Sequence, residues 1–382
     1  MNTDSKVYLK KKFKQFYWKN QIKAPKEVER REFGTGTLES KIKVRHKSFK
    51  TERELRGFLT REAPYYISYS SAFYQFPENQ PMERKKWLGA EVVFDLDKEI
   101  EYLNEKAFEE VREEAMNLVD FLLKDFGLQN KRIETNFSGG KGYHIHVSSA
   151  EVKELGRDER QEIVDYITAT GFDLNCFFTR EAVSGVSLKG RGGFHSRDSS
   201  TAVVRGPMEG DTGWGKRIFD VAFDLVSSDK LKLRREYGLR TKQAKILYDN
   251  RELNQRLLRE GKWDALKGLT KHMREKIIER YAVSMVEDTD RMVTVDTSRL
   301  IRLPDTLHGG SSLIAKKVKN LESFNPLVDA VAFSDDEVSI RVKEKTPPFH
   351  MNENTFKLNK GKTKIPEYVA VYLLLKDKAE ID

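Results

Sequence analysis

The chain has 382 residues and a formal net charge of +9, from 69 lysines and arginines against 60 aspartates and glutamates. A chain of this length can bury a full core, either in one large domain with an insertion or in two domains. Its single cysteine, Cys176, excludes an internal disulfide framework and a cysteine-rich zinc module. No apolar run approaches the ~20 residues of a membrane span, so we expect a soluble, cytoplasmic protein.

The positive charge is concentrated in two segments. Residues 1–50 hold 15 basic and 5 acidic side chains, residues 216–280 hold 18 and 10, and the rest of the chain carries a net charge of −9. Two basic surfaces on a mildly acidic body predict a polyanionic partner such as nucleic acid. A well-solvated charged surface, as found in heat-stable proteins, explains the same charge equally well.

The first third of the chain alternates between helical and strand-like segments. Residues 4–19 carry apolar side chains at helical spacing among lysines, which predicts a basic amphipathic helix whose aromatic face packs on the core. Strand-like segments follow over 30–46, and a short helix over 51–61 has Thr51 as its N-cap. The run over 90–97 is nearly all apolar before its aspartates, which is typical of a strand covered on both faces.

Helices dominate the middle of the chain. The apolar residues of 104–126 define one face of a long helix, and Gly127 is in place to end it. The later expected elements are two strands around a glycine turn in KRIETNFSGGKGYHIHVS, a helix over 157–170, an inserted basic helical subdomain over 216–280, a strand over 291–303 and a short helix over 366–376. This order predicts an α/β (α+β) fold in which residues 1–215 and 281–382 form a core with a mixed β-sheet and flanking helices.

The stretch VVFDLDKE, residues 92–99, places two carboxylates in an otherwise apolar strand. Side chains alternate along a strand, so Asp95 and Asp97 lie on one face about 7 Å apart. Their charges repel unless a cation lies between them, and a hard divalent ion such as Mg²⁺ prefers such oxygen ligands. The structural alternative is that Asp97 caps the next turn and Asp95 pairs with a lysine. Two-ion phosphoryl transfer needs a third carboxylate, for which the spacing allows either Asp290 or Asp296.

Residues 138–146, SGGKGYHIH, combine a hydroxyl, several backbone N–H groups, a lysine and two histidines at a glycine turn. Glycines let the backbone approach an anion closely, and such turns bind phosphate. The motif is not a Walker loop, because the glycine spacing and the Lys-Ser/Thr pair are absent. One alternative is an ordinary hairpin with a surface lysine. Another is a zinc site at His144 and His146, for which the sequence offers no third ligand nearby.

Residues 302–310, RLPDTLHGG, bring an arginine and a histidine to a second glycine turn. The guanidinium of Arg302 suits a fork of hydrogen bonds to phosphate oxygens, and His308 can donate to the same group. The alternative is that Arg302 pairs with an acidic neighbour and His308 merely precedes a tight turn. Together the three motifs predict an acidic pole for metal and a basic pole for triphosphate.

The motifs WLGAEVVFDLD, SGGKGYHIHV and RLIRLPDTLHGG, in this order and at these separations, resemble those of the archaeo-eukaryotic primase catalytic subunit. The archaeal small subunit is the type that they resemble most. The resemblance covers nearly the whole chain, because four further segments also fit: RHKSF at 45–49, YYISYSSAFY at 65–74, GWGKR at 213–217 and IPEYVAVYLLL at 365–375. It implies a core of the primase type.

The resemblance implies a role for each matching residue. Asp95 and Asp97 fall on the family's paired metal-binding aspartates, and Asp290, 18 residues before His308, falls on the third. These carboxylates are then expected to bind two Mg²⁺ or Mn²⁺ ions, and Asp296 is not. The positions that contact the nucleotide triphosphate are matched by Ser138, Lys141, His144, Arg302 and His308.

The chain departs from the family pattern in two places. Many members have arginine where this chain has Lys141, so a bidentate phosphate contact becomes a single-point contact, which puts nucleotide affinity in doubt. Many relatives also carry a cysteine/histidine zinc knuckle after the aspartate pair. Residues 98–110, KEIEYLNEKAFEE, contain neither residue type, so we expect no structural zinc.

The resemblance thus implies a DNA-directed nucleotidyltransferase, the catalytic subunit of a DNA primase that makes short primers from NTPs, and from dNTPs if its pocket admits them. The implied partners are single-stranded DNA template, the nascent primer and a large primase subunit with an iron–sulfur cluster. The basic N-terminal segment and the 216–280 helices are candidate contacts for template or large subunit, and the sequence does not choose between them. Two alternatives are a non-catalytic nucleic-acid-binding scaffold and a repair-type primase-polymerase that acts alone; the C-terminal 365–375 segment favours the replicative subunit.

Overall fold

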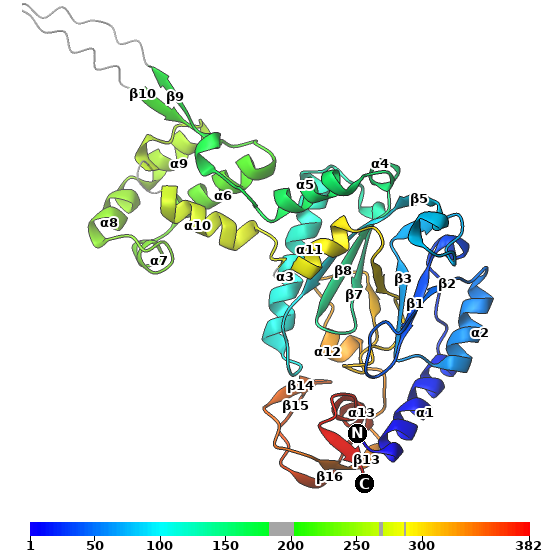
Figure 1. Cartoon of the computed structure of the whole chain (residues 1–382). Helices are drawn as coiled ribbons and strands as arrows, with labels where there is room; N and C mark the ends of the chain where they lie inside the picture. Colours follow the sequence, from blue (N-terminus) through cyan, green and yellow to red (C-terminus); the bar gives the residue numbers. More distant parts are fainter. Residues whose placement is uncertain (183–201, 267–269, 286–287) are drawn as a thin grey trace, which may run out of the picture. The chain divides into compact units, whose positions relative to one another are not determined.

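The structure is a computed structural model that describes residues 1–182, 202–266, 270–285 and 288–382 (Figure 1). Its contacts divide the chain into two compact units. Unit one comprises Met1–Val119, Leu128–Val164 and Ser284–Asp382, and unit two comprises Asp120–Gly127 and Asp165–Val283. The predicted insertion at 216–280 lies inside unit two, which also takes in residues that precede it.

Unit one contains two four-stranded sheets, and they confirm the predicted α/β class. The first sheet has the order β11-β3-β1-β2, with β1 at Phe33–Gly36, β2 at Val44–Lys47, β3 at Tyr66–Ser70 and β11 at Leu300–Arg302. The second has the order β12-β7-β8-β6, with β6 at Val92–Asp97, β7 at Ile133–Phe137, β8 at Gly142–Val147 and β12 at Lys316–Val318. Every strand pair among the described residues is antiparallel.

Smaller elements surround these sheets. Two hairpins pair β4 (Ala72–Tyr74) with β5 (Trp87–Ala90) and β14 (Phe349–Met351) with β15 (Asn354–Phe356). A three-stranded sheet joins β16 (Gly361–Pro366), β13 (Glu337–Val342) and β17 (Ala379–Ile381). The short helices are α4 (Ala150–Lys153), α5 (Arg157–Ile167) and α12 (Pro326–Asp329).

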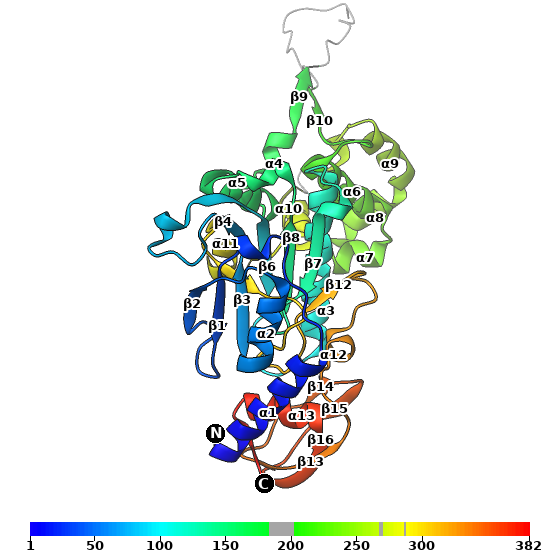
Figure 2. The same ribbon diagram turned by 90° about the vertical axis from the view of Figure 1, so that its right-hand side faces the viewer.

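Three predicted helices, two near the N-terminus and one near the C-terminus, are confirmed. Helix α1 (Thr3–Lys19) begins after Asn2, whose side-chain oxygen accepts a hydrogen bond from the Ser5 N–H at 2.9 Å. Helix α2 (Glu52–Glu62) begins after Thr51, whose hydroxyl accepts from the Glu54 N–H at 3.2 Å, so Thr51 is the expected N-cap. Helix α13 (Glu367–Leu375) is buried almost throughout. Both views place the two chain termini beside each other near α1 and α13 (Figure 2).

Two boundaries differ from the sequence-based expectation. The long helix α3 (Glu105–Lys124) ends before Gly127, which lies beyond it in the left-handed region with φ +65°. The strand predicted over 291–303 is wrong in its first half, because Asp288–Val295 forms helix α11 and only β11 is extended. Asp290 and Thr294 are four residues apart, so they lie on one face of the helix, and both are buried. Packing of α11 against β6 overrides the β propensity of the valines and threonine in this segment.

Unit two is mainly helical. Its elements are β9 (Thr179–Ala182), β10 (Ala202–Arg205), α6 (Gly213–Ser227), α7 (Lys230–Arg235), α8 (Thr241–Asp249), α9 (Arg251–Arg259) and α10 (Thr270–Tyr281). The buried Arg217 of α6 donates to Asp125 at 2.8 Å and to Asp120 at 3.1 Å, and its guanidinium lies 3.8 Å from the centre of the Phe121 ring. In the described part of the chain, no helix combines the length and the apolar character needed to cross a membrane.

A buried ionic network joins the two large sheets of unit one. Arg31, just before β1, donates to the Ser70 and Ser71 carbonyls at 2.8 Å and pairs with Glu91, just before β6, at 2.8 Å. Glu91 also lies 3.3 Å from Nδ1 of His146 on β8. Burial alone would raise the pKa of Glu91, but the hydrogen bond with His146 and the charge of Arg31 outweigh burial and lower the pKa to about 2.

We predict that Glu91 makes unit one acid-sensitive. A carboxyl whose pKa falls from 4.5 to about 2 on folding stabilises the fold fully above pH 4.5, and this contribution is lost as the pH falls towards 2. Between pH 6 and pH 3 the Glu91→Gln variant should therefore lose about 2 kcal/mol less unfolding free energy than the wild type. Urea unfolding followed by circular dichroism measures the difference. Glu337→Gln, at a side chain 70% exposed, is the matched control and should keep the wild-type pH dependence.

Candidate active site

The strand β6 ends with two carboxylates on one face. Asp95 pairs in register with His144 of β8, and Asp97 pairs with Gly142. The Oδ1 atoms of both aspartates are buried and accept no hydrogen bond; His144 Nε2 lies 3.3 Å from Asp95 Oδ1 in a geometry that does not make one. Burial and the neighbouring charges of Asp95 and Asp290 raise the pKa of Asp97 to about 7. Orphaned acceptors of this kind are suited to a cation.

The third predicted carboxylate comes from helix α11. Asp290 is buried, and it is close enough to β6 for its charge to contribute to the raised pKa of Asp97. Asp296 has a different environment: its Oδ1 accepts hydrogen bonds from the Ser298 N–H at 2.9 Å and hydroxyl at 2.7 Å, and Arg299 lies 3.5 Å from its Oδ2. Asp296 therefore holds the turn between α11 and β11, whereas the charge of buried Asp290 acts on Asp97.

The donor set fits a divalent cation in kind, since it consists of hard carboxylate oxygens on adjacent elements. The arrangement is open, because the described residues contain no group of three or more Asp, Glu, His or Cys side chains placed to hold one ion. The unpartnered oxygens of Asp95 and Asp97 are thus the first ligands available to a cation, and Asp290 would complete the set from α11.

The glycine hairpin between β7 and β8 is closed by its own serine. The Ser138 hydroxyl accepts from the N–H groups of Gly140 and Gly142, both at 3.2 Å, and the Ser138 N–H donates to the Gly142 carbonyl at 2.8 Å. Gly139 has φ +77°, and a Cβ there would lie 2.9 Å from the Ala315 backbone nitrogen. The glycines therefore serve close backbone packing, and the turn presents Lys141 at its tip.

A histidine and an arginine form the opposite wall. His308 is half-buried, and desolvation together with the charges of Arg302, Lys41 and Lys141 lowers its pKa well below the ordinary value. The Gly310 N–H lies 3.3 Å from His308 Nδ1, so the neutral ring carries its proton on Nε2. Nε2 faces Gly140, where a Cβ would lie 3.1 Å away. Arg302 is buried, with its guanidinium 4.8 Å from the Tyr66 ring centre, and burial lowers its pKa.

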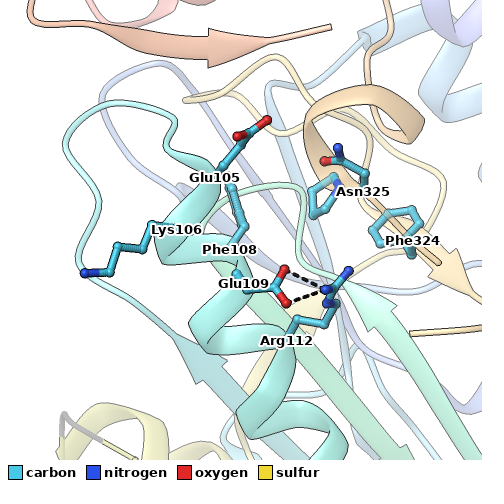
Figure 3. Close-up of a pocket in the computed structure, with 8 residues that line it drawn as sticks. Glu105, Lys106, Phe108, Glu109, Arg112, Phe324 and Asn325 are labelled. Carbon is cyan, nitrogen blue, oxygen red and sulfur yellow. Dashed lines mark hydrogen bonds and ion pairs between the residues drawn. The ribbon is translucent and has the colours of Figure 1, made fainter. Parts of the chain in front are cut away.

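One cavity of about 410 Å³ brings most of the predicted residues together. Seven of the eight predicted site residues line it, namely Asp95, Asp97, Ser138, Lys141, His144, Arg302 and His308. Asp290 does not line it. A slightly larger cavity of about 420 Å³ at the start of α3 contains none of these residues, and there Arg112 is paired with Glu109 at 2.6 Å (Figure 3).

The cavity also contains residues that the sequence did not single out. Lys41 comes from the loop between β1 and β2, Tyr66 and Ser68 from alternate positions of β3, and Lys376 follows α13. Strand alternation in YYISYS could have paired Tyr66 with Ser68, since residues two apart share a face. Nothing in the local sequence distinguishes Lys41 or Lys376 from the other 67 lysines and arginines, because only the tertiary fold brings them to the cavity.

The cavity combines hard carboxylate oxygens with cationic N–H donors. This combination is typical of a nucleotidyltransferase-type enzyme. The comparisons with known proteins agree. The sequence model of the family described as DNA primase small subunit matches residues 94–319. The chain is 34% identical to the DNA primase small subunit PriS of Methanothrix thermoacetophila over all of both chains. It is 34% identical to that of Methanococcoides burtonii and 32% to that of Archaeoglobus fulgidus, with at least 99% of each chain covered.

The chain belongs to the DNA primase small-subunit family. The family resemblance read from the three motifs is thereby confirmed over the whole length of the chain, and with it a nucleotidyltransferase-type enzyme that acts in DNA replication.

We predict that Gly142 is irreplaceable in the hairpin. A Cβ at this position would lie 1.7 Å from the Leu96 carbonyl oxygen, so β6 and β8 could not stay paired. Gly142→Ala should lower the unfolding free energy by about 3 kcal/mol or more, measured by thermal or urea unfolding. Gly57→Ala in α2, where the added Cβ meets no atom within 4 Å, is the control and should raise stability by up to about 1 kcal/mol. Equal stability of Gly142→Ala and wild type would contradict this close approach.

Proposed function

We propose that the chain is the catalytic subunit of a DNA primase, which starts primers on single-stranded DNA by two-metal-ion nucleotidyl transfer from NTPs. The observation that carries the proposal is the half-buried aspartate pair, whose buried Oδ1 atoms accept no hydrogen bond, in the same cavity as a lysine, an arginine and a neutral histidine. A triphosphate with its metal ions carries both charges that such a cavity can bind. The names of the relatives support the choice of primer synthesis over other nucleotidyl transfers.

The proposed mechanism assigns a role to each cavity residue. Asp95, Asp97 and Asp290 would hold two Mg²⁺ or Mn²⁺ ions, which supply activation of the attacking hydroxyl and neutralisation of the leaving pyrophosphate. Arg302 would orient phosphate oxygens through its planar fork of N–H donors, and Lys141 would add a point charge at the hairpin tip. The neutral His308 would donate its Nε2–H to a phosphate oxygen without adding charge. His144 would contact the triphosphate, as the family resemblance implies, and the Ser138 hydroxyl proton is free to donate, because its oxygen accepts from the turn.

The partners follow from this role. Single-stranded template, nascent primer and NTPs are the proposed ligands, and a large primase subunit is the proposed protein partner, as the term small subunit in the names of the relatives suggests. Use of dNTPs as well as NTPs, a cytoplasmic location and the absence of a structural zinc stay predictions. A non-catalytic scaffold would not need three retained carboxylates around one strand end, and this chain has all three.

We predict that the double variant Asp95→Asn, Asp97→Asn loses template-directed nucleotide incorporation and stays folded. Neutral amides bind divalent cations much more weakly than carboxylates do, while removal of two repelling charges leaves the fold at least as stable. Incorporation of a labelled nucleotide in metal-replete buffer, with circular dichroism of the same sample, measures both. Full activity of the double variant would refute the metal assignment.

Single variants separate the two candidates for the third carboxylate. Asp290→Asn should lose incorporation, whereas Asp296→Asn, which alters only the turn held by Ser298, is the matched control and should retain it. The reverse result would move the third ligand to Asp296.

We predict that Lys141→Arg strengthens nucleotide binding. An arginine at the hairpin tip can donate a second hydrogen bond to the phosphates, which is worth about 1 kcal/mol, or about a fivefold lower KM for NTP, with kcat unchanged. Steady-state kinetics over NTP concentration measures both constants. Lys360→Arg, at an exposed position outside the cavity, is the control. An unchanged or higher KM would mean that Lys141 does not contact the phosphates.

A further inference from the structure

Helix α1 divides into a buried and an exposed face. Its inner face contributes Leu9, Phe13, Phe16 and Tyr17 to the core, and the helix packs against α2, α13 and β17. Two of its lysines are also engaged on this side: Lys10 donates to the carbonyls of Glu62 and Ala63, and Lys12 pairs with Glu367. Phe13, Phe16 and Tyr17, the aromatic residues expected to pack on the core, do so, but one further aromatic residue of the helix does not.

The exception is Trp18, whose exposed fraction is 77%. It continues a stripe formed by Val7, Lys11, Lys14 and Trp18, which are spaced i, i+4, i+7 and i+11 and so lie on one side of the helix. Val7 is 63% exposed, and neither Lys11 nor Lys14 has an ion pair or hydrogen bond within the described residues. We call these four residues the α1 stripe. An exposed tryptophan next to unpaired lysines costs solvation free energy without any gain inside the chain.

The stripe belongs to the surroundings of the active-site cavity. Tyr17, next to Trp18, donates from its hydroxyl to the Pro64 carbonyl at 3.4 Å, and Lys10 donates to the Ala63 carbonyl at 3.2 Å. This segment leads directly into β3, whose Tyr66 and Ser68 line the cavity. Helix α1 is thus adjacent to a segment that walls the cavity.

We propose that the α1 stripe binds the single-stranded DNA template, with a base stacked on Trp18 and phosphates beside Lys11 and Lys14. This inference rests on the proposed function, because it assigns a surface to the template of that reaction. Basic grooves interrupted by aromatic rings are the usual platform for single strands, since every base can stack and every nucleotide carries a phosphate.

The composition of the stripe favours DNA over a protein partner. Lysine is depleted in the centres of protein interfaces, and here two unpaired lysines lie between the two apolar residues. Asp4 is the helix's one acidic residue, and it lies in the first turn, so no carboxylate of α1 repels a phosphate along the stripe. The net charge of residues 1–26, with eight lysines and one aspartate, complements a polyanion.

Tryptophan fluorescence tests the stacking directly. Of the four tryptophans, Trp214 and Trp263 are buried, and Trp18 and Trp87 are exposed, at 77% and 44%. Titration of the full chain with a 20-nucleotide oligothymidylate, without metal or NTP, should quench the emission in a saturable way. Trp18→Phe should lose most of the quenching and Trp18→Ala should bind about tenfold more weakly, whereas Trp87→Phe, the matched control, should behave as wild type.

Salt dependence tests the phosphate contacts. In Lys11→Glu, Lys14→Glu, the slope of log affinity against log salt should fall in magnitude by about 1.4, because each lost phosphate contact on a single strand contributes about 0.7. Lys357→Glu, Lys360→Glu makes the same charge change elsewhere in unit one and should leave the slope unchanged. Wild-type affinity in Trp18→Ala together with an unchanged slope in the lysine variant would overturn the proposal.

Two further results keep this inference separate from the proposed function. The Asp95→Asn, Asp97→Asn variant should bind the oligonucleotide as wild type does, since binding needs no metal, and its loss of incorporation tests only the catalytic role. Trp18→Ala should raise the KM for template and leave kcat unchanged. If Trp18→Ala instead bound DNA normally and failed to associate with a large subunit, the stripe would be a protein interface and the proposal would be wrong.

Discussion

Two like charges on one face of a buried strand are the constraint on which the rest of unit one depends. Asp95 and Asp97 lose water when β6 is covered, and their Oδ1 atoms gain no hydrogen bond in return. Burial and mutual repulsion both disfavour the doubly ionised pair, so this strand end is less stable than an apolar one would be. The destabilisation must be offset by packing elsewhere in the unit, and either a proton on Asp97 or a ligand of positive charge relieves it at its source.

The opposite end of the same strand shows how the fold treats a buried carboxylate when no ligand is needed. Glu91 lies just before β6 and is more buried than Asp97, yet it receives a salt bridge from Arg31, a hydrogen bond from the Ser148 hydroxyl and a close contact with His146. These contacts lower the pKa of Glu91, whereas the surroundings of Asp97 raise its pKa. The fold can therefore provide hydrogen bonds and a counter-charge for a buried carboxylate next to β6. The unsatisfied state of the aspartate pair is a selective feature of one end of the strand and not a general defect of the sheet.

The parts of the site that lie within one element could be predicted from the sequence, and the parts assembled between elements could not. Strand alternation alone places Asp95 and Asp97 on one face, and the capping role of Thr51 follows from its position before an amphipathic run. The segment that carries Asp290 was expected to be a strand, because its local composition favours one and its packing against β6 is invisible in the sequence. Spacing likewise left Asp290 and Asp296 equivalent; the family resemblance favours Asp290, and the hydrogen bonds of Asp296 to Ser298 commit that side chain to a turn. Lys41 and Lys376 reach the cavity only through contacts distant in sequence.

The aspartate pair and the basic wall of the cavity together restrict the kind of ligand that can bind there. The basic wall already holds Lys41, Lys141 and Arg302, and their charges add to burial in keeping His308 neutral. A free anion bound there would leave the aspartate pair uncompensated, and a free cation bound at the aspartates would add to the positive charge facing it. The proposed ligand, a triphosphate that carries divalent ions, would satisfy both poles at once, and the binding of each component would then strengthen that of the other. The same argument explains why the neutral His308 is useful: its Nε2–H can donate to a phosphate oxygen without increasing the repulsion among the three cations.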